Sequence, residues 1–260
     1  MRVSAFVVCA ISALSITTRR VAAQDLFEIQ VYPYETVEPG RTMVEFHTNF
    51  IPSGTKTTDE GLYANHHQVH ETLEITHGWT KTFETGFYIE TAPYVPDVGA
   101  KFTGFHIRPR FRFPQLETFP FQVSISFEYA FNRPGFDPNG QTLEIRPIFE
   151  RQDGRLYLSI NPDLGLAIKG PDSGSAPEFE PNFKIGWDVT KEVAAGIEYY
   201  AETGPVKHFD RLSEQHHIVF PTIDLNVSPD WELNFGVGRG LTDTSEHWIV
   251  KGIVGYRFKR

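Results

Sequence analysis

From Thr42 onward the chain consists largely of stretches in which apolar and polar residues alternate one by one. Because successive side chains of an extended strand point to opposite faces, this pattern predicts strands with one apolar and one polar face. No segment of comparable strength has helical periodicity. Twelve alternating segments are found near residues 41–51, 66–76, 81–91, 102–113, 120–132, 141–151, 155–168, 178–188, 192–202, 214–227, 231–239 and 246–258.

Most of these segments have about the 9–11 residues that a tilted strand needs to cross a bilayer. No stretch after residue 23 approaches the ~18 consecutive apolar residues of a transmembrane helix. A sheet in hydrocarbon cannot leave its edge unpaired, so it must close on itself. We therefore predict an all-β fold, a closed antiparallel up-and-down barrel of about 12 strands over residues 41–258, with rings outward and a polar lumen. The rival is a soluble β-sandwich with an apolar interior.

The connections between the segments alternate strictly between long and short. The long ones are rich in loop-forming residues. An even number of strands predicts that both ends of the chain emerge on the short-turn side, which in outer-membrane barrels is the periplasm. All four tryptophans fall near predicted strand ends, as in an interfacial girdle. Four prolines inside the segments, Pro109, Pro147, Pro181 and Pro221, predict bulges there.

Residues 1–23 have the features of a secretory signal peptide: Arg2 precedes an apolar stretch, and small residues end at Ala23. The only cysteine, Cys9, lies in this leader, so disulfides and thiolate metal sites are excluded from the remainder. Without the three leader arginines the chain carries a formal charge of −12, which argues against nucleic-acid partners. Residues 24–40 are expected to form a periplasmic N-terminal tail or a plug.

The polar faces of the predicted strands suggest how the lumen could act on solutes. Arg108, Arg110 and Arg112 alternate with other residues on one predicted strand, so their side chains share one face. Each would destabilise the barrel by about 2–4 kcal/mol if it faced lipid at the bilayer midplane, so all three are expected to face inward. A charged constriction that selects solutes by sign and size and a packed network of ion pairs both fit this pattern. The candidate lumen and solute-binding residues are Arg108, Arg110, Arg112, Glu84, Glu128, Glu144, Arg146 and Lys184.

Other possible sites are weaker. His66 and His70 share a strand face but supply only two metal ligands, so no metal site and no cofactor is expected. Ser124, Ser126 and Ser159 lie on strands with no histidine nearby in sequence, and no catalytic residue is assigned. An enzyme acting on lipid would need a serine and a histidine that meet only in space.

The leader, the alternating strands and the aromatic last strand, Trp248 to Phe258, resemble the bacterial outer-membrane β-barrel superfamily, although Lys259 and Arg260 follow the final aromatic. The size and layout also resemble the outer-membrane transporters assigned to the MetA pathway of phenol degradation. The resemblance implies contact with outer-membrane lipid and recognition of the last strand by the barrel-assembly machinery. The expected function is passive passage or uptake of small solutes, not catalysis. The alternatives are an outer-membrane lipid-modifying enzyme and a structural barrel with a sealed interior.

Overall fold

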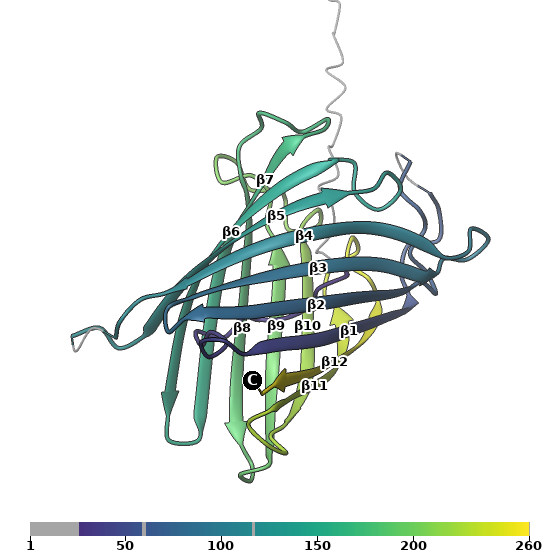
Figure 1. Cartoon of the computed structure of the whole chain (residues 1–260). Coiled ribbons are helices and arrows are strands. Elements are labelled where there is room, and N and C mark those ends of the chain that lie inside the picture. The colour runs from purple at the N-terminus through teal and green to yellow at the C-terminus, as the bar shows by residue number, and fades with distance from the viewer. Residues whose placement is uncertain (1–25, 59–60, 116–117, 260) are drawn as a thin grey trace, which may run out of the picture.

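The computed structural model describes residues 26–58, 61–115 and 118–259, and the predicted signal peptide lies outside them. Twelve strands form one closed antiparallel barrel in which every strand pairs with its neighbours in sequence (Figure 1). No described helix is long and apolar enough to span a membrane. The strands are β1 (Thr42–Ser53), β2 (Val69–Thr80), β3 (Phe83–Tyr94), β4 (Lys101–Arg112), β5 (Gln122–Asn132), β6 (Gln141–Asp153), β7 (Leu156–Lys169), β8 (Glu178–Asp188), β9 (Val193–Glu202), β10 (His216–Leu225), β11 (Trp231–Gly240) and β12 (Trp248–Phe258).

The barrel closes between the first and last strands. Thr42 lies opposite Phe258 and Phe50 lies opposite Val250, so β1 and β12 pair along most of their length. β1 therefore begins and β12 ends on the side of the short turns, and the longer loops gather at the opposite end. The prediction that both chain ends lie on the short-turn side does not hold for the amino-terminal part, because Leu26 lies at the long-loop end. The fold class predicted from the sequence is confirmed.

The predicted inward and outward faces are also correct. Along β1, Glu45, His47 and Asn49 are buried while Phe46 is 54% exposed. All four tryptophans are exposed, three at short-turn strand ends and Trp248 at the long-loop end of β12. The outward apolar side chains supply the surface that a lipid bilayer requires, which excludes the sandwich alternative.

Two local predictions are wrong. β2 begins at Val69 and ends at Thr80, three to four residues later than predicted, because His67 occupies a turn with φ of 66° and Gly78 still pairs with the chain before β1. Three of the four prolines cause no bulge: the register on both sides of Pro109, Pro147 and Pro221 is unchanged. At Pro181 the ladder with β7 is regular, but the ladder with β9 stops at Asn182, and beyond it Glu178 pairs with Pro205, one residue out of register. A missing N–H removes a ladder bond without requiring an extra residue.

Residues 26–40, which we call the inner segment, lie inside the barrel for most of their length. Leu26 packs near Ile51 and Ile249 at the long-loop end of β1 and β12. At the other end, Gly40 donates a backbone hydrogen bond to Gly78 at the short-turn end of β2. The inner segment therefore passes through the lumen from the long-loop end to the short-turn end before the chain enters β1.

Candidate functional site: the charged lumen

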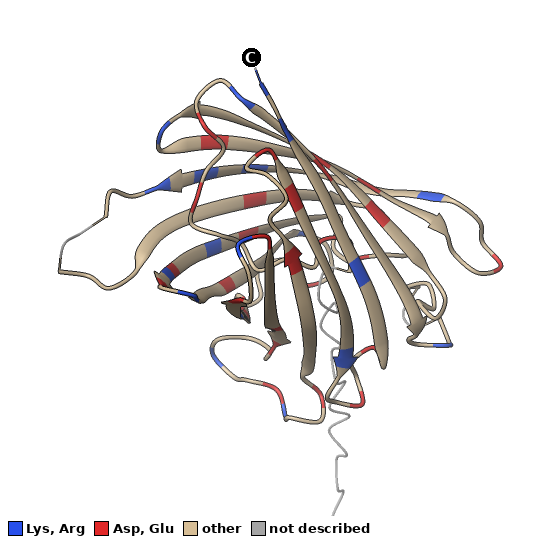
Figure 2. Cartoon of the chain, turned by 90° about the horizontal axis from the view of Figure 1, so that it is seen from below, with Lys and Arg blue, Asp and Glu red and all other residues tan. Residues whose placement is uncertain are grey.

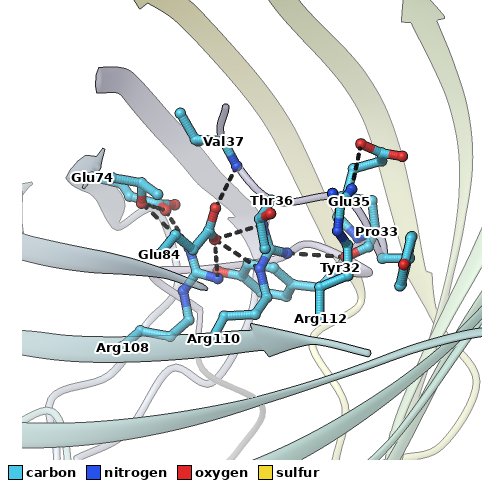
Figure 3. Close-up of polar contacts among 12 residues, drawn as sticks. Tyr32, Pro33, Glu35, Thr36, Val37, Glu74, Glu84, Arg108, Arg110 and Arg112 are labelled. Atoms are coloured by element: carbon cyan, nitrogen blue, oxygen red, sulfur yellow. Dashed lines mark hydrogen bonds and ion pairs between the residues drawn. The ribbon is translucent and has the colours of Figure 1, made fainter. Parts of the chain in front are cut away.

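The first charged cluster of the lumen joins β2, β3 and β4 (Figure 3). Alternation on β4 directs Arg108 and Arg110 inward, and the ladder places Glu84 of β3 directly opposite Arg110. The Arg110 Nε donates to Glu84 Oε1 at 2.7 Å, and Arg108 Nη2 lies 2.6 Å from Oε1 of Glu74 on β2. All four side chains are buried, so their charges are compensated inside the barrel rather than by water.

Arg112 is the third arginine of the predicted series, and it lies closer to the end of the barrel. It is half-buried, and its Nη1 donates to Glu35 Oε2 of the inner segment at 3.1 Å. Its guanidinium also lies over the ring of Tyr34, 5.2 Å from the centroid. The three arginines therefore share one face but not one set of partners.

A second cluster is centred on a histidine that the sequence analysis did not select. His106 Nδ1 lies 2.8 Å from Glu128 Oε1, and its Nε2 lies 3.2 Å from Glu90 Oε2, so two carboxylates flank one imidazole. Arg146 Nη2 lies 2.6 Å from Glu144 Oε1, and Arg146 Nε lies 3.2 Å from Asp163 Oδ2. Glu128, Glu144 and Arg146 thus meet, as parts of a network across β5, β6 and β7.

The third cluster lies on the other side of the barrel. Lys184 Nζ contacts Asp224 Oδ1 at 2.8 Å and Glu198 Oε1 at 3.1 Å. The other oxygen of Glu198 accepts a hydrogen bond from Lys251, which also donates to the carbonyl of Ile29 at 3.0 Å. Of the predicted residues, Lys184 is therefore separate from the arginine series and belongs to this group.

The inner segment is held by side chains of the wall. Its backbone groups bond mainly to polar side chains: Tyr32 N–H donates to Asn161 Oδ1 at 2.7 Å and Val37 N–H to Glu84 Oε2 at 2.6 Å. Arg110 Nη1 donates to the Pro33 carbonyl at 3.0 Å. These bonds satisfy the backbone of a strand-like segment that pairs with no sheet.

The ring of Tyr32 lies between guanidinium groups from different strands. The Cζ atom of Arg146 lies 4.0 Å from the ring centroid, and that of Arg108 lies 4.7 Å from it. Cation–π contacts of this kind gain strength when water is excluded. Tyr32 therefore joins the first and second clusters through the middle of the lumen.

The lumen is not uniformly polar, which corrects the sequence-based expectation. Leu26, Ile29 and Val31 pack with inward apolar residues of four strands, and Phe27 forms a second apolar cluster with Ala92 and Val95. The sequence contains a signal for this apolar part of the lumen: Ile249 and Ile253 break the alternation of the last strand, and both are fully buried. Inward apolar residues need an apolar partner, and the inner segment supplies one.

A cavity of about 240 Å³ remains beside the inner segment. Its lining combines the first cluster with residues of β1, β11 and β12 toward the short-turn end: it includes Tyr32, Glu45, Glu74, Arg108, Arg110 and Glu232. Among the described residues, eleven buried glutamates and aspartates compare with four buried arginines and lysines. Acidic and basic positions both follow the strands around the barrel (Figure 2), but the interior has an acidic excess.

The remaining predicted sites are not assembled. His66 stacks on His67 in the β1–β2 loop, whereas His70 is buried and stacks on Phe27, so the two histidines do not share a site. Ser159 donates to the Tyr32 carbonyl, and the hydroxyls of Ser124 and Ser126 have no hydrogen-bond partner. None of these three serines is therefore paired with a histidine.

Comparison with known proteins agrees with this architecture. The family described as "Putative MetA-pathway of phenol degradation" matches residues 72–258, and no curated protein matches the chain. The COG4313 outer-membrane channel from Pseudomonas putida F1 is similar in structure, with a TM-score of 0.61, 11% identity, and coverage of 89% of this chain and 100% of that one.

Two porins are also similar in structure. The KdgM porin has a TM-score of 0.55 and 10% identity, covering 84% of this chain and 99% of its own. The NanC porin has a TM-score of 0.54 and 9% identity, covering 84% and 100%. At these identities the likeness shows the fold alone: the chain has the closed β-barrel architecture of these outer-membrane channels and porins.

Proposed function

The chain belongs to the family of the MetA pathway of phenol degradation, and from this premise we propose that its barrel is a channel for passive passage of small solutes. The observation that supports the proposal is the cavity of about 240 Å³, which is lined by charged side chains and lies toward the short-turn end of the lumen. A spanning barrel with charged side chains and free space in its interior provides a route for polar solutes that lipid does not. The eight residues predicted from sequence would contribute to its selectivity.

The charge balance of the interior indicates which solutes would pass. Carboxylates exceed guanidinium and ammonium groups among the buried residues, and rings of carboxylates favour cations. Small neutral and cationic solutes are therefore expected to pass more readily than anions. A small neutral aromatic solute, which the family description suggests, satisfies this condition.

Single-channel recording in planar bilayers tests the proposal with two opposed variants. Arg110→Ala removes a positive charge from the cavity, and we expect the cation-to-anion permeability ratio to rise about twofold or more. Glu232→Gln removes a negative charge from the same cavity, so the ratio should fall. Arg151→Ala, whose partly exposed side chain pairs with Asp153 at a short turn, is the matched control and should leave the ratio unchanged.

Absence of conductance, or conductance that neither lumen variant alters, would contradict a selective channel. Absence of conductance would favour the second candidate, a structural barrel with a sealed interior. The inner segment and the ion-pair clusters that fill much of the lumen support this candidate. Nothing in the described residues favours the lipid-modifying enzyme.

A further inference from the structure

Three potential metal ligands meet in the lumen outside the contacts that hold the inner segment. Glu45 and His47 point inward from β1, and Glu74 lies directly opposite Glu45 on β2. One donor atom from each of the three lies within 4.8 Å of the others. Their side chains are at least nine-tenths buried, with exposed fractions of 5%, 1% and 1%.

The donor atoms that face one another have no hydrogen-bond partner. Oε1 of Glu45, Oε2 of Glu74 and both ring nitrogens of His47 are buried without one. The shortest contact between two of these ligands is 3.5 Å, from His47 Nε2 to Glu74 Oε2. Buried polar atoms are nearly always hydrogen-bonded, so two carboxylate oxygens and an imidazole without such partners suit a bound cation.

The charge balance indicates a cation. Glu74 uses its other oxygen, Oε1, to bind Arg108 at 2.6 Å and Thr76, which leaves Oε2 available. Glu45 forms no ion pair within the described part of the chain, although it lies directly opposite another carboxylate. Two buried carboxylates at this separation repel each other unless a proton or a cation lies between them.

The surrounding structure leaves space for Glu45 and gives access to solvent. Opposite Glu45 on β12 lies Gly255, where a Cβ atom would come within 2.7 Å of the Glu45 Cγ. Glu45 and Glu74 both line the 240 Å³ cavity, which provides room for a metal-bound water. The site is therefore reachable from the cavity toward the short-turn end.

We propose that Glu45, His47 and Glu74 bind a divalent transition-metal cation, of which Zn²⁺ is the probe to use. One imidazole and two carboxylates form the mixed nitrogen and oxygen set that such ions accept, with a fourth position for water. Zinc ligands at 2.0–2.2 Å lie roughly 3.3 Å apart in a tetrahedron, close to the 3.5 Å found between His47 and Glu74. The site does not depend on the channel function.

The second group of this kind, Glu28, His106 and Glu128, does not carry the same proposal. Both nitrogens of His106 already lie beside carboxylates, at 2.8 Å from Glu128 and 3.2 Å from Glu90. Nδ1 of this imidazole is therefore already hydrogen-bonded to Glu128, and only Nε2 is without a hydrogen bond. His47 differs because neither of its nitrogens is hydrogen-bonded.

The test is zinc titration of the folded, detergent-solubilised protein after chelator treatment, by competition with a chromogenic chelator. We expect one Zn²⁺ per chain with a dissociation constant below about 10 μM, and an X-ray absorption spectrum with one imidazole and oxygen ligands. His47→Gln and Glu45→Gln should each weaken binding at least tenfold. If either variant fails to fold, as judged by heat-modifiable gel mobility, Glu45→Asp replaces it, and the shortened carboxylate should weaken binding as well.

The matched control is the His66→Asn/His67→Asn double variant in the β1–β2 loop, which should bind zinc as the parent does. Absence of binding tighter than 1 mM would overturn the proposal. So would loss of binding in the loop variant with retention in His47→Gln and Glu45→Gln. Because the readout is zinc affinity, failure here is independent of any conductance result.

Discussion

Glu84 is the residue on which the contacts of the first cluster converge. It is fully buried and accepts hydrogen bonds from Arg110 and from the backbone N–H of Val37, and Arg108 Nη1 lies 3.4 Å from it. One carboxylate thus neutralises guanidinium groups of β4 and also holds the inner segment. Such a buried charge stabilises the fold only as long as its partners are present.

Replacing Glu84 by alanine is expected to destabilise the barrel by about 3–5 kcal/mol, because two buried guanidinium groups lose a partner. Urea unfolding in detergent, followed by tryptophan fluorescence, measures the change. Asp153→Ala breaks the partly exposed pair with Arg151 and should cost no more than about 1 kcal/mol. Equal effects of the two substitutions would show that Glu84 does not organise the cluster.

The sequence predicts which side chains of the strands face inward but not which of them become partners. Arg110 and Glu84 lie opposite each other because their strands are adjacent in sequence and pair. The contact between Arg108 and Glu74 crosses β3, which is possible because Gly86 between them has no side chain. His106 appeared in the sequence only as one polar residue of an alternating strand, and its two carboxylate partners became visible only with the register known.

At the level of elements, alternation identified all twelve strands, because burial on one face and lipid on the other impose the period directly. The inner segment carries no such signal. It is extended, but wall residues surround it on all sides. Because it has no solvent-facing or lipid-facing side, Leu26, Ile29 and Val31 do not belong to an apolar–polar alternation. Its path depends on hydrogen bonds from side chains of several different strands, which no local pattern records.

The β5–β6 loop contains a carboxyl group with a shifted titration. Burial raises the pKa of Asp137 to about 6, against hydrogen bonds from Asn139 N–H and Asn132 Nδ2 that lower it. Because the folded pKa lies above the ordinary value of 3.8, the folded loop retains its proton longer than the unfolded chain does. The contribution of Asp137 to stability therefore falls as the pH rises from about 4 to about 6 and stays low above that range.

Hydrogen exchange of the loop amides, corrected for the intrinsic pH dependence, measures this effect. Protection of residues 133–140 should be higher at pH 4.5 than at pH 7.5. Asp137→Asn, which keeps an acceptor for Asn139 but does not ionise, should make protection independent of pH over this range. A pH dependence that persists in the variant would assign the effect to another group.

For the whole molecule, the space inside the barrel is divided between the wall side chains, the inner segment and the cavity. The segment packs its apolar residues against inward apolar residues of the wall, and the cavity lies beside it among charged side chains. The conducting cross-section of a twelve-stranded barrel of this kind therefore depends on one stretch of about fifteen residues as much as on the wall.

Deletion of residues 26–37 is expected to raise single-channel conductance several-fold, since it removes Tyr32 and the apolar clusters from the lumen. Tyr32→Ala, which keeps the backbone in place, should produce a smaller increase. Deletion of residues 207–211 in the long β9–β10 loop serves as the control, because it also removes a stretch of chain but lies outside the strands and the inner segment. Unchanged conductance after removal of the segment, in a barrel that still shows heat-modifiable mobility, would contradict this assignment.

The attachments of the inner segment also bear on how the protein is assembled. Its backbone is bound by side chains of strands from the first to the last: Asn49 of β1, Glu84 of β3, Arg110 of β4, Asn161 of β7 and Lys251 of β12. If the barrel closed without the inner segment, the carboxylates, guanidinium groups and isoleucines that face the lumen would lack the contacts that the segment provides. Biogenesis must therefore bring the amino-terminal portion inside before, or together with, the joining of the first strand to the last.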